Sequence, residues 1–132
     1  MKTHFQQRIL IAEDSCVMSG VMRFNLQKAG FEVEVAENGR IAAEWLMAEP
    51  FDLLLTDFQM PEMDGDELCR RLRECPLNDE IPIIMVSAKG FELDIPSLQA
   101  ELGIVEVIYK PFSPRQIVET VNQVLSAVSV AS

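Results

Sequence analysis

Short, continuous apolar runs alternate along the chain with segments whose apolar residues recur at every third or fourth position. The first pattern is typical of buried strands, and the second is typical of helices that bury one face. The predicted strands span residues 8–14, 31–36, 51–57, 81–88 and 104–109. The run 31–36 alternates apolar and polar residues, so we expect it to be half exposed, whereas 51–57 has the apolar character of a central parallel strand.

Helices are predicted between these strands, because capping and helix-stopping residues stand at their expected ends. Ser15 precedes the first helical segment and Gly30 follows it, and Pro50 and Pro76 end the next two. The apolar stripe predicted for the first helix consists of Met18, Val21, Met22, Leu26 and Ala29.

The last two predicted helices differ in length. A short helix is expected over 94–103 with Asp94 as its cap. A longer one is expected over 113–128, where Ser113 and Gln116 match a capping box. Its predicted buried stripe consists of Ile117, Val121, Val124 and Leu125.

Strands that alternate with helices predict an α/β fold with a doubly wound, five-stranded parallel sheet. The chain has 132 residues, which suits a single domain over 1–132 with a core over about 8–127. Trp45, Phe24 and the methionines are expected in this core or at its margin. Arg70, Arg71 and Arg73 are expected to form a solvated helix face.

The excess of acidic residues limits the kinds of molecule that the chain is expected to bind. Eleven basic and 21 acidic residues leave a net charge of -10, which disfavours nucleic acids and anionic membranes and favours cations or basic proteins. No apolar run is long enough to span a bilayer, and the N-terminus lacks the apolar segment of a signal peptide. Cys16, Cys69 and Cys75 form an odd set without metal-site spacing, which predicts free thiols and a cytoplasmic location.

Reactive side chains follow four of the predicted strands. Glu13 and Asp14 follow the first, Asp57 ends the third, Ser87 lies in the fourth and Lys110 follows the fifth. Ligands of such sheets bind beyond the carboxyl ends of the strands. We therefore expect these five side chains to share one rim.

The charges on this rim predict its chemistry. Three neighbouring carboxylates repel one another, and Mg²⁺ with its preference for oxygen ligands relieves that repulsion. Asp57 could then attack phosphorus as a nucleophile, while Lys110 and Ser87 would face the phosphoryl oxygens. Each residue alone also has a structural explanation, and Asp64 is expected to be a turn or cap residue rather than a ligand. The functional interpretation depends on all five together.

Four motifs in order, "IAEDS", "LLLTDFQMPEMDG", "MVSAKG" and "YKPF", make the chain resemble the response-regulator receiver domains of two-component signalling. The resemblance covers about residues 8–127. It implies a flavodoxin-like (βα)5 fold with strand order 2-1-3-4-5. It also implies a phosphohistidine donor on a sensor histidine kinase or phosphotransfer protein, an unidentified downstream protein, and a monomer or weak homodimer.

The resemblance also implies roles at the metal site. Asp57 would be the phosphoacceptor, and Asp14 and Asp57 would bind Mg²⁺ directly. Glu13 would act through water, and the backbone carbonyl of Gln59 would complete the ligands.

The switch residues implied by the resemblance lie on the last two strands. Ser87 would follow the phosphoryl group, Lys110 would pair with it, and the bond before Pro111 would be cis. Many family members carry an aromatic residue where Val107 stands. Tyr109 is expected on the same face as Val107, and whether it takes over the aromatic role is open.

Three other functions compete with a phosphorylation switch. An aspartate-nucleophile phosphatase resembles this site, but it needs a second aspartate where Gln59 stands. A flavodoxin-like nucleotide binder needs a phosphate-cradling loop where "EDSCV" is acidic. A pseudo-receiver that is never phosphorylated would not need the full set of residues. We expect no enzyme for external substrates, only catalysis of self-phosphorylation and slow self-dephosphorylation.

Overall fold

Five parallel strands alternate with five helices in the computed structural model, which describes residues 6–88 and 95–131. The elements are β1 (Arg8–Ala12), α1 (Cys16–Lys28), β2 (Glu32–Ala36), α2 (Gly39–Ala48), β3 (Leu53–Asp57), α3 (Gly65–Arg73), β4 (Ile83–Ala88), α4 (Ile95–Leu102), β5 (Ile104–Lys110) and α5 (Pro114–Ala131). The strand order is β2-β1-β3-β4-β5. The predicted doubly wound fold and its strand order are confirmed.

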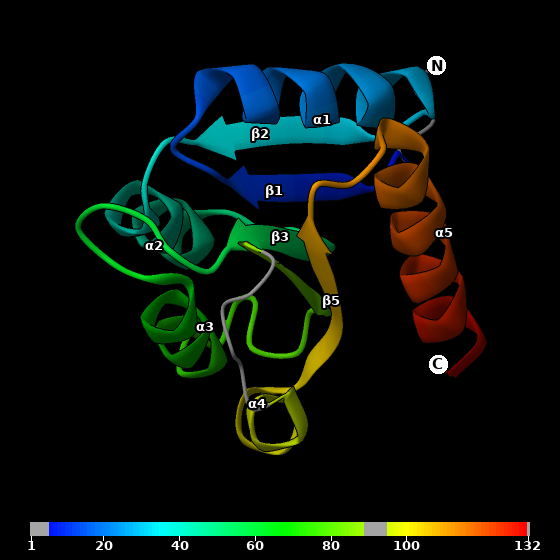
Figure 1. Cartoon of the computed structure of the whole chain (residues 1–132). Coiled ribbons are helices and arrows are strands. Elements are labelled where there is room, and N and C mark those ends of the chain that lie inside the picture. The colour runs from blue at the N-terminus through cyan, green and yellow to red at the C-terminus, as the bar shows by residue number, and fades with distance from the viewer. Residues whose placement is uncertain (1–5, 89–94, 132) are drawn as a thin grey trace.

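Each face of the sheet packs against its own apolar cluster. Residues of α2, α3 and α4 cover one face, and residues of α1 and α5 cover the other; Figure 1 shows α2 and α3 on the opposite side of the sheet from α5. Along β3, Leu54 belongs to the first cluster, whereas Leu53 and Leu55 belong to the second. This two-sided burial explains why the β3 sequence is apolar rather than alternating.

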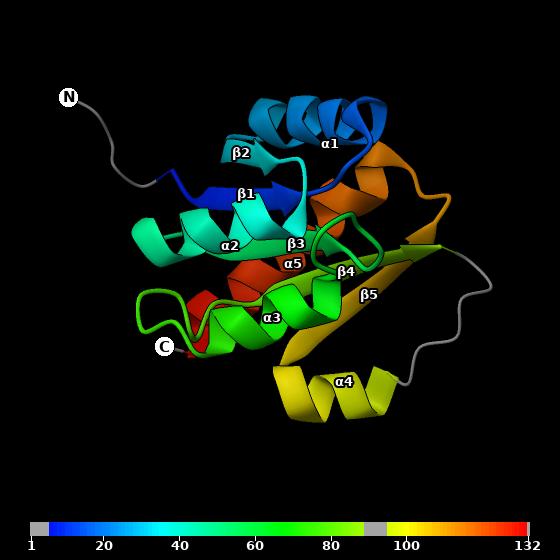
Figure 2. The same ribbon diagram turned by 90° about the vertical axis from the view of Figure 1, so that its left-hand side faces the viewer.

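The chain direction places all strand carboxyl ends along one edge of the sheet, on the right in Figure 2. The strand order reverses between β1 and β3, because β1 leads to β2 on one side while β3 leads to β4 on the other. Such a reversal leaves a crevice beyond the strand ends. The loops after β1 and β3 therefore meet there.

Helix caps agree with the sequence analysis, and several boundaries move by a few residues. Ser15 Oγ accepts a hydrogen bond from the Met18 N–H, and Ser113 Oγ accepts one from the Gln116 N–H. Strand β1 ends at Ala12, so the acid pair lies in the loop. Helix α3 ends at Arg73, and α5 continues to Ala131. The fourth helix is short, as predicted, and Asp94 lies outside the described residues.

The predictions that Val21 lies in the buried stripe of α1 and that Phe24 lies in the core or at its margin were wrong. Phe24 is 64% exposed and Val21 is 41% exposed, while Met22 and Leu26 are buried against the sheet. Phe24 stands two positions from Met22, which is about 200° around a helix, so the two cannot face the same way. Met47 on α2 is likewise exposed rather than in the core.

Arg73 is half-buried rather than solvated. Its guanidinium donates to backbone carbonyls of Asp79, Ile81, Leu102 and Gly103. It therefore ties the α4–β5 turn to the segment before β4, and burial lowers its pKa. Arg70 and Arg71 are exposed, as predicted.

All three cysteines are free; Cys16 is exposed, and Cys69 and Cys75 are buried. Within the described ranges, no helix combines the length and the apolar character needed to cross a membrane.

Candidate functional site

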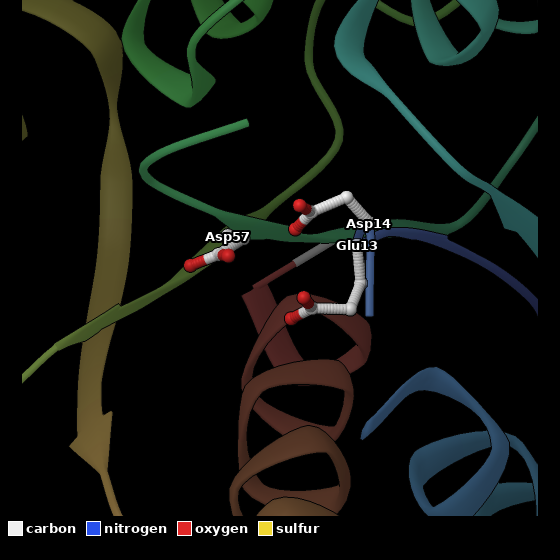
Figure 3. A group of neighbouring side chains, drawn as sticks. All are labelled: Glu13, Asp14 and Asp57. Carbon is white, nitrogen blue, oxygen red and sulfur yellow. The ribbon is translucent and has the colours of Figure 1, made fainter. Parts of the chain in front are cut away.

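Two adjacent strands bring the three predicted carboxylates together. Ala12 at the end of β1 pairs with Thr56 of β3, so the residues that follow each lie side by side. One oxygen from each of Glu13, Asp14 and Asp57 lies within 4.8 Å of the others, and Figure 3 shows the three groups converging from the two strand ends. Asp14 is exposed, whereas the other two are buried.

Asp57 is a buried carboxylate with two partners. One oxygen, Oδ2, lies 3.3 Å from Lys110 Nζ, and the other, Oδ1, accepts a hydrogen bond of 3.0 Å from the Phe58 N–H. Burial raises the pKa of Asp57, and the positive charge of Lys110 opposes that rise. Only 7% of the residue is exposed. The group is therefore held in place at the rim with its charge only partly compensated.

Glu13 is less well compensated than Asp57. Its Oε2 accepts a hydrogen bond of 3.1 Å from the Ser15 N–H, but its Oε1 lies 3.6 Å from Lys110 Nζ. Oε1 is buried and has no hydrogen-bond partner among the described residues. Burial and the charge of Asp57 raise the pKa of Glu13 to about 7.

These residues fit a hard divalent cation. Among the described residues, three carboxylates lie near a single lysine, and one buried oxygen lacks a hydrogen-bond partner. Mg²⁺ binds carboxylate and carbonyl oxygens and takes few protein ligands. A cation between the carboxylates would compensate the charge that Lys110 leaves uncovered.

Ser87 and Lys110 come to the rim from the neighbouring strands. Val86 of β4 pairs with Asp57, so Ser87 lies one residue beyond it, and Ala88 pairs with Lys110. The buried Ser87 hydroxyl lies 3.5 Å from the Ala88 carbonyl oxygen, which is at the limit for a hydrogen bond. This weak contact leaves the hydroxyl available to a stronger acceptor.

The β5 residues singled out in the sequence lie close to this rim. Tyr109 pairs with Ser87 across the strands and is 37% exposed. Val107 is half-buried and packs against the α2, α3 and α4 side. The Lys110–Pro111 peptide bond is cis.

The loop between β3 and α3 carries Gln59 past the site and returns to β3. The Gly65 N–H donates to the Phe58 carbonyl at 2.7 Å, and a Cβ at Gly65 would collide with the Asp57 carbonyl oxygen. Position 65 therefore requires glycine because the backbone of Asp57 lies too close for a side chain, and not because of its backbone angles. Asp64 precedes α3 as its cap residue, although its carboxylate makes no capping hydrogen bond.

The sequence predicted a turn at 37–39, but it did not predict that this turn contacts the β3–α3 loop. Asn38 and Arg40 both contact Glu62. The only signal in the sequence was an Asn-Gly pair, which indicates a turn and a helix start but not its distant partner.

The comparisons with known proteins agree with this geometry. Residues 9–122 match the family model described as the response regulator receiver domain. The chain belongs to this family. The resemblance that four motifs indicated is thus confirmed, and the family places the chain in two-component signalling.

Solved structures extend the match. The chemotaxis response regulator CheY4 of Vibrio cholerae is 28% identical, with a TM-score of 0.82, over 90% of this chain and 98% of that one. A CheY-like receiver domain protein of Methanospirillum hungatei is 27% identical, with a TM-score of 0.85, over 96% and 99%. The receiver domain of a histidine kinase from Syntrophus aciditrophicus is 32% identical, with a TM-score of 0.79, over 92% of each chain.

Proposed function

We propose that the chain is a phosphorylation-dependent signalling switch whose phosphoacceptor is Asp57. The observation that carries the proposal is the position of Asp57 between Lys110 and the acid pair. A carboxylate oxygen of Asp57 attacks the phosphorus of a phosphohistidine. The new O–P bond forms as the N–P bond breaks, and the imidazole leaves and takes up a proton.

The metal site supports this chemistry. Asp14, Asp57 and the Gln59 carbonyl would hold Mg²⁺, and Glu13 would contribute through water. Bound Mg²⁺ supplies positive charge to the phosphoryl oxygens during transfer. Lys110 is placed to pair with the same oxygens, because its ammonium group already lies 3.3 Å from Asp57 Oδ2.

The signal leaves the site through β4 and β5. A phosphoryl group on Asp57 offers the Ser87 hydroxyl a stronger acceptor than the Ala88 carbonyl, so Ser87 turns toward it. Its neighbour Tyr109 and the α4 region then change the surface offered to a downstream protein.

The donor protein would contact α1, which begins directly after the acid pair. Val17, Val21 and Phe24 form an exposed apolar stripe along this helix. Phe24→Glu is expected to slow transfer from a phosphorylated histidine kinase roughly tenfold, the usual scale for a central interface residue. Transfer from acetyl phosphate serves as the control and stays unchanged; equal slowing of both donors would contradict this contact.

Intact-mass spectrometry after incubation with acetyl phosphate tests the proposal. The wild-type chain should gain one phosphoryl group with Mg²⁺ and none with a chelator, and Asp57→Asn should gain none. An adduct of equal yield in Asp57→Asn would show that another residue is the acceptor. A folded chain that gains no adduct and binds no Mg²⁺ would instead support the pseudo-receiver alternative.

A further inference from the structure

The tip of the β3–α3 loop is fastened to the first turn of α2. Glu62 Oε1 accepts a hydrogen bond of 2.9 Å from Arg40 Nε, and Glu62 Oε2 accepts one of 3.4 Å from Asn38 Nδ2. We call this set of three residues the loop clamp. It joins residues that are 22 and 24 positions apart in the sequence.

Glu62 is an unexpected residue for its backbone conformation. Its φ of 69° lies in the left-handed region, which is unfavourable for a residue with a Cβ and which glycine or asparagine adopts more easily. The two hydrogen bonds explain what a glutamate side chain adds at this position. Its length lets the carboxylate reach α2.

The α2 side of the clamp is equally constrained. Asn38 is buried, and its Oδ1 accepts a hydrogen bond of 2.8 Å from the Ile41 N–H while its Nδ2 binds Glu62. A Cβ at Gly39 would collide with the Met63 carbonyl oxygen. The start of α2 and the loop therefore pack in direct contact.

Gln59 lies in the chain between the base of the loop at Phe58 and the clamp residue Glu62. The base of the loop is closed by the hydrogen bond from Gly65 to Phe58, and its middle by one of 2.8 Å from the Met63 N–H to the Pro61 carbonyl. With its base and its tip both held, the loop has little freedom to turn the Gln59 carbonyl. A ligand that is held in place before the ion arrives binds it more tightly.

We propose that Glu62 and Arg40 are positioning residues for the Mg²⁺ site, acting through the Gln59 carbonyl. This rests on the proposed function, since it assumes that the site binds Mg²⁺. Both side chains are about half exposed, at 50% and 51%, so their ion pair adds little to the stability of the fold. Its loss should therefore appear in the affinity for Mg²⁺ rather than in the free energy of unfolding.

Isothermal titration calorimetry with MgCl₂ tests the clamp, with urea unfolding as the second measurement. Glu62→Asn keeps a residue that tolerates left-handed φ but removes the reach to Arg40. We expect its dissociation constant for Mg²⁺ to rise roughly tenfold, the lower scale for residues that orient metal ligands. Its unfolding midpoint should stay within the error of the wild type.

Glu67→Gln is the matched control. Glu67 has the same charge, is similarly exposed and is paired with Arg71 at 3.2 Å on α3, so it reports the loss of one negative charge alone. The double exchange Arg40→Glu with Glu62→Arg should restore much of the affinity that Glu62→Arg loses.

Two results would overturn the clamp. If Glu62→Asn binds Mg²⁺ as the control does, Glu62 has no positioning role, while the proposed function stands. If the wild-type chain itself binds no Mg²⁺, both proposals fail together.

Discussion

The two ends of the sheet differ in how well their charged side chains are compensated by partners. At the amino end, Arg8 is surrounded by partners: Glu32 at 3.1 Å, Glu49 at 2.9 Å and the Pro50 carbonyl at 2.9 Å. Its guanidinium also lies 4.5 Å from the centre of the Phe51 ring. Arg8 and the two acids are therefore paired with one another, and the acids are also exposed to water.

At the carboxyl end, Lys110 is the one lysine among the described residues that pairs with the two buried carboxylates, and the exposed Asp14 lies beside them. Lys110 lies 3.3 Å from Asp57 and 3.6 Å from Glu13, and Oε1 of Glu13 is buried without a hydrogen bond to any described residue. Local rules of charge satisfaction are broken mostly at functional sites. The difference between the two ends therefore marks where a ligand is needed, although both are rich in acidic residues.

The largest effect should come from Glu13→Gln, which removes the poorly compensated charge. The pKa of Glu13 is about 7 in the folded chain against an ordinary 4.5, so the unfolded chain loses its proton first as the pH rises. The stabilising contribution of this group is complete below pH 4.5 and is lost by about pH 7. The loss is on the order of 3 kcal/mol, from the free energy per pKa unit.

Urea unfolding without Mg²⁺ at several pH values measures this loss. Between pH 4.5 and about pH 7, the free energy of unfolding of the wild type should fall relative to that of Glu13→Gln. Glu49→Gln at the amino end is the control, and its free energy of unfolding should change with pH as that of the wild type does. If the free energies of unfolding of the wild type and Glu13→Gln changed with pH in parallel, the surroundings of Glu13 would not raise its pKa.

The next effect is stabilisation by Mg²⁺. At 100 times its dissociation constant, an ion that binds only the folded chain adds about 2.7 kcal/mol to the free energy of unfolding. Asp14→Asn should abolish this gain, and because Asp14 is exposed the substitution should leave the fold intact. Thermal unfolding with MgCl₂ or a chelator measures it. A full gain in Asp14→Asn would remove Asp14 from the ligand set.

The smallest effect should come from the amino end of the sheet, where Arg8 is paired with acidic residues. Arg8→Met loses ion pairs with acids that are 47% and 52% exposed and one ring contact, which together contribute about 1 to 2 kcal/mol. Urea unfolding should show that loss, and calorimetry should show an unchanged affinity for Mg²⁺. A large fall in affinity would indicate that the two ends are coupled through the sheet.

The sequence predicted the sheet and the rim because both depend on short patterns. An apolar β3 must be covered on both faces, and parallel strands carry their last residues to one edge, so Asp57, Ser87 and Lys110 could be placed together without coordinates. The orientation of α1 was harder to predict. Its apolar residues lie on several sides of the helix. Periodicity placed Val21 in the buried stripe, and its apolar side chain alone placed Phe24 in the core or at its margin.

The sequence could not predict which polar side chains contact residues or backbone groups far away in the chain. Arg73 binds carbonyls up to 30 positions away, and carbonyls carry no signature in the residue letters. Glu62 and Arg40 gave no periodic signal either. Such contacts depend on how the loops lie after the core has packed.

The exposed thiol of Cys16 has a practical use. It stands in the first residue of α1, beside the acid pair, while burial raises the pKa of Cys69 to about 12 and Cys75 is also buried. A thiol-reactive dye should therefore label the native chain at one place without any engineering. Its fluorescence would report phosphorylation as it happens, in a cuvette and in real time.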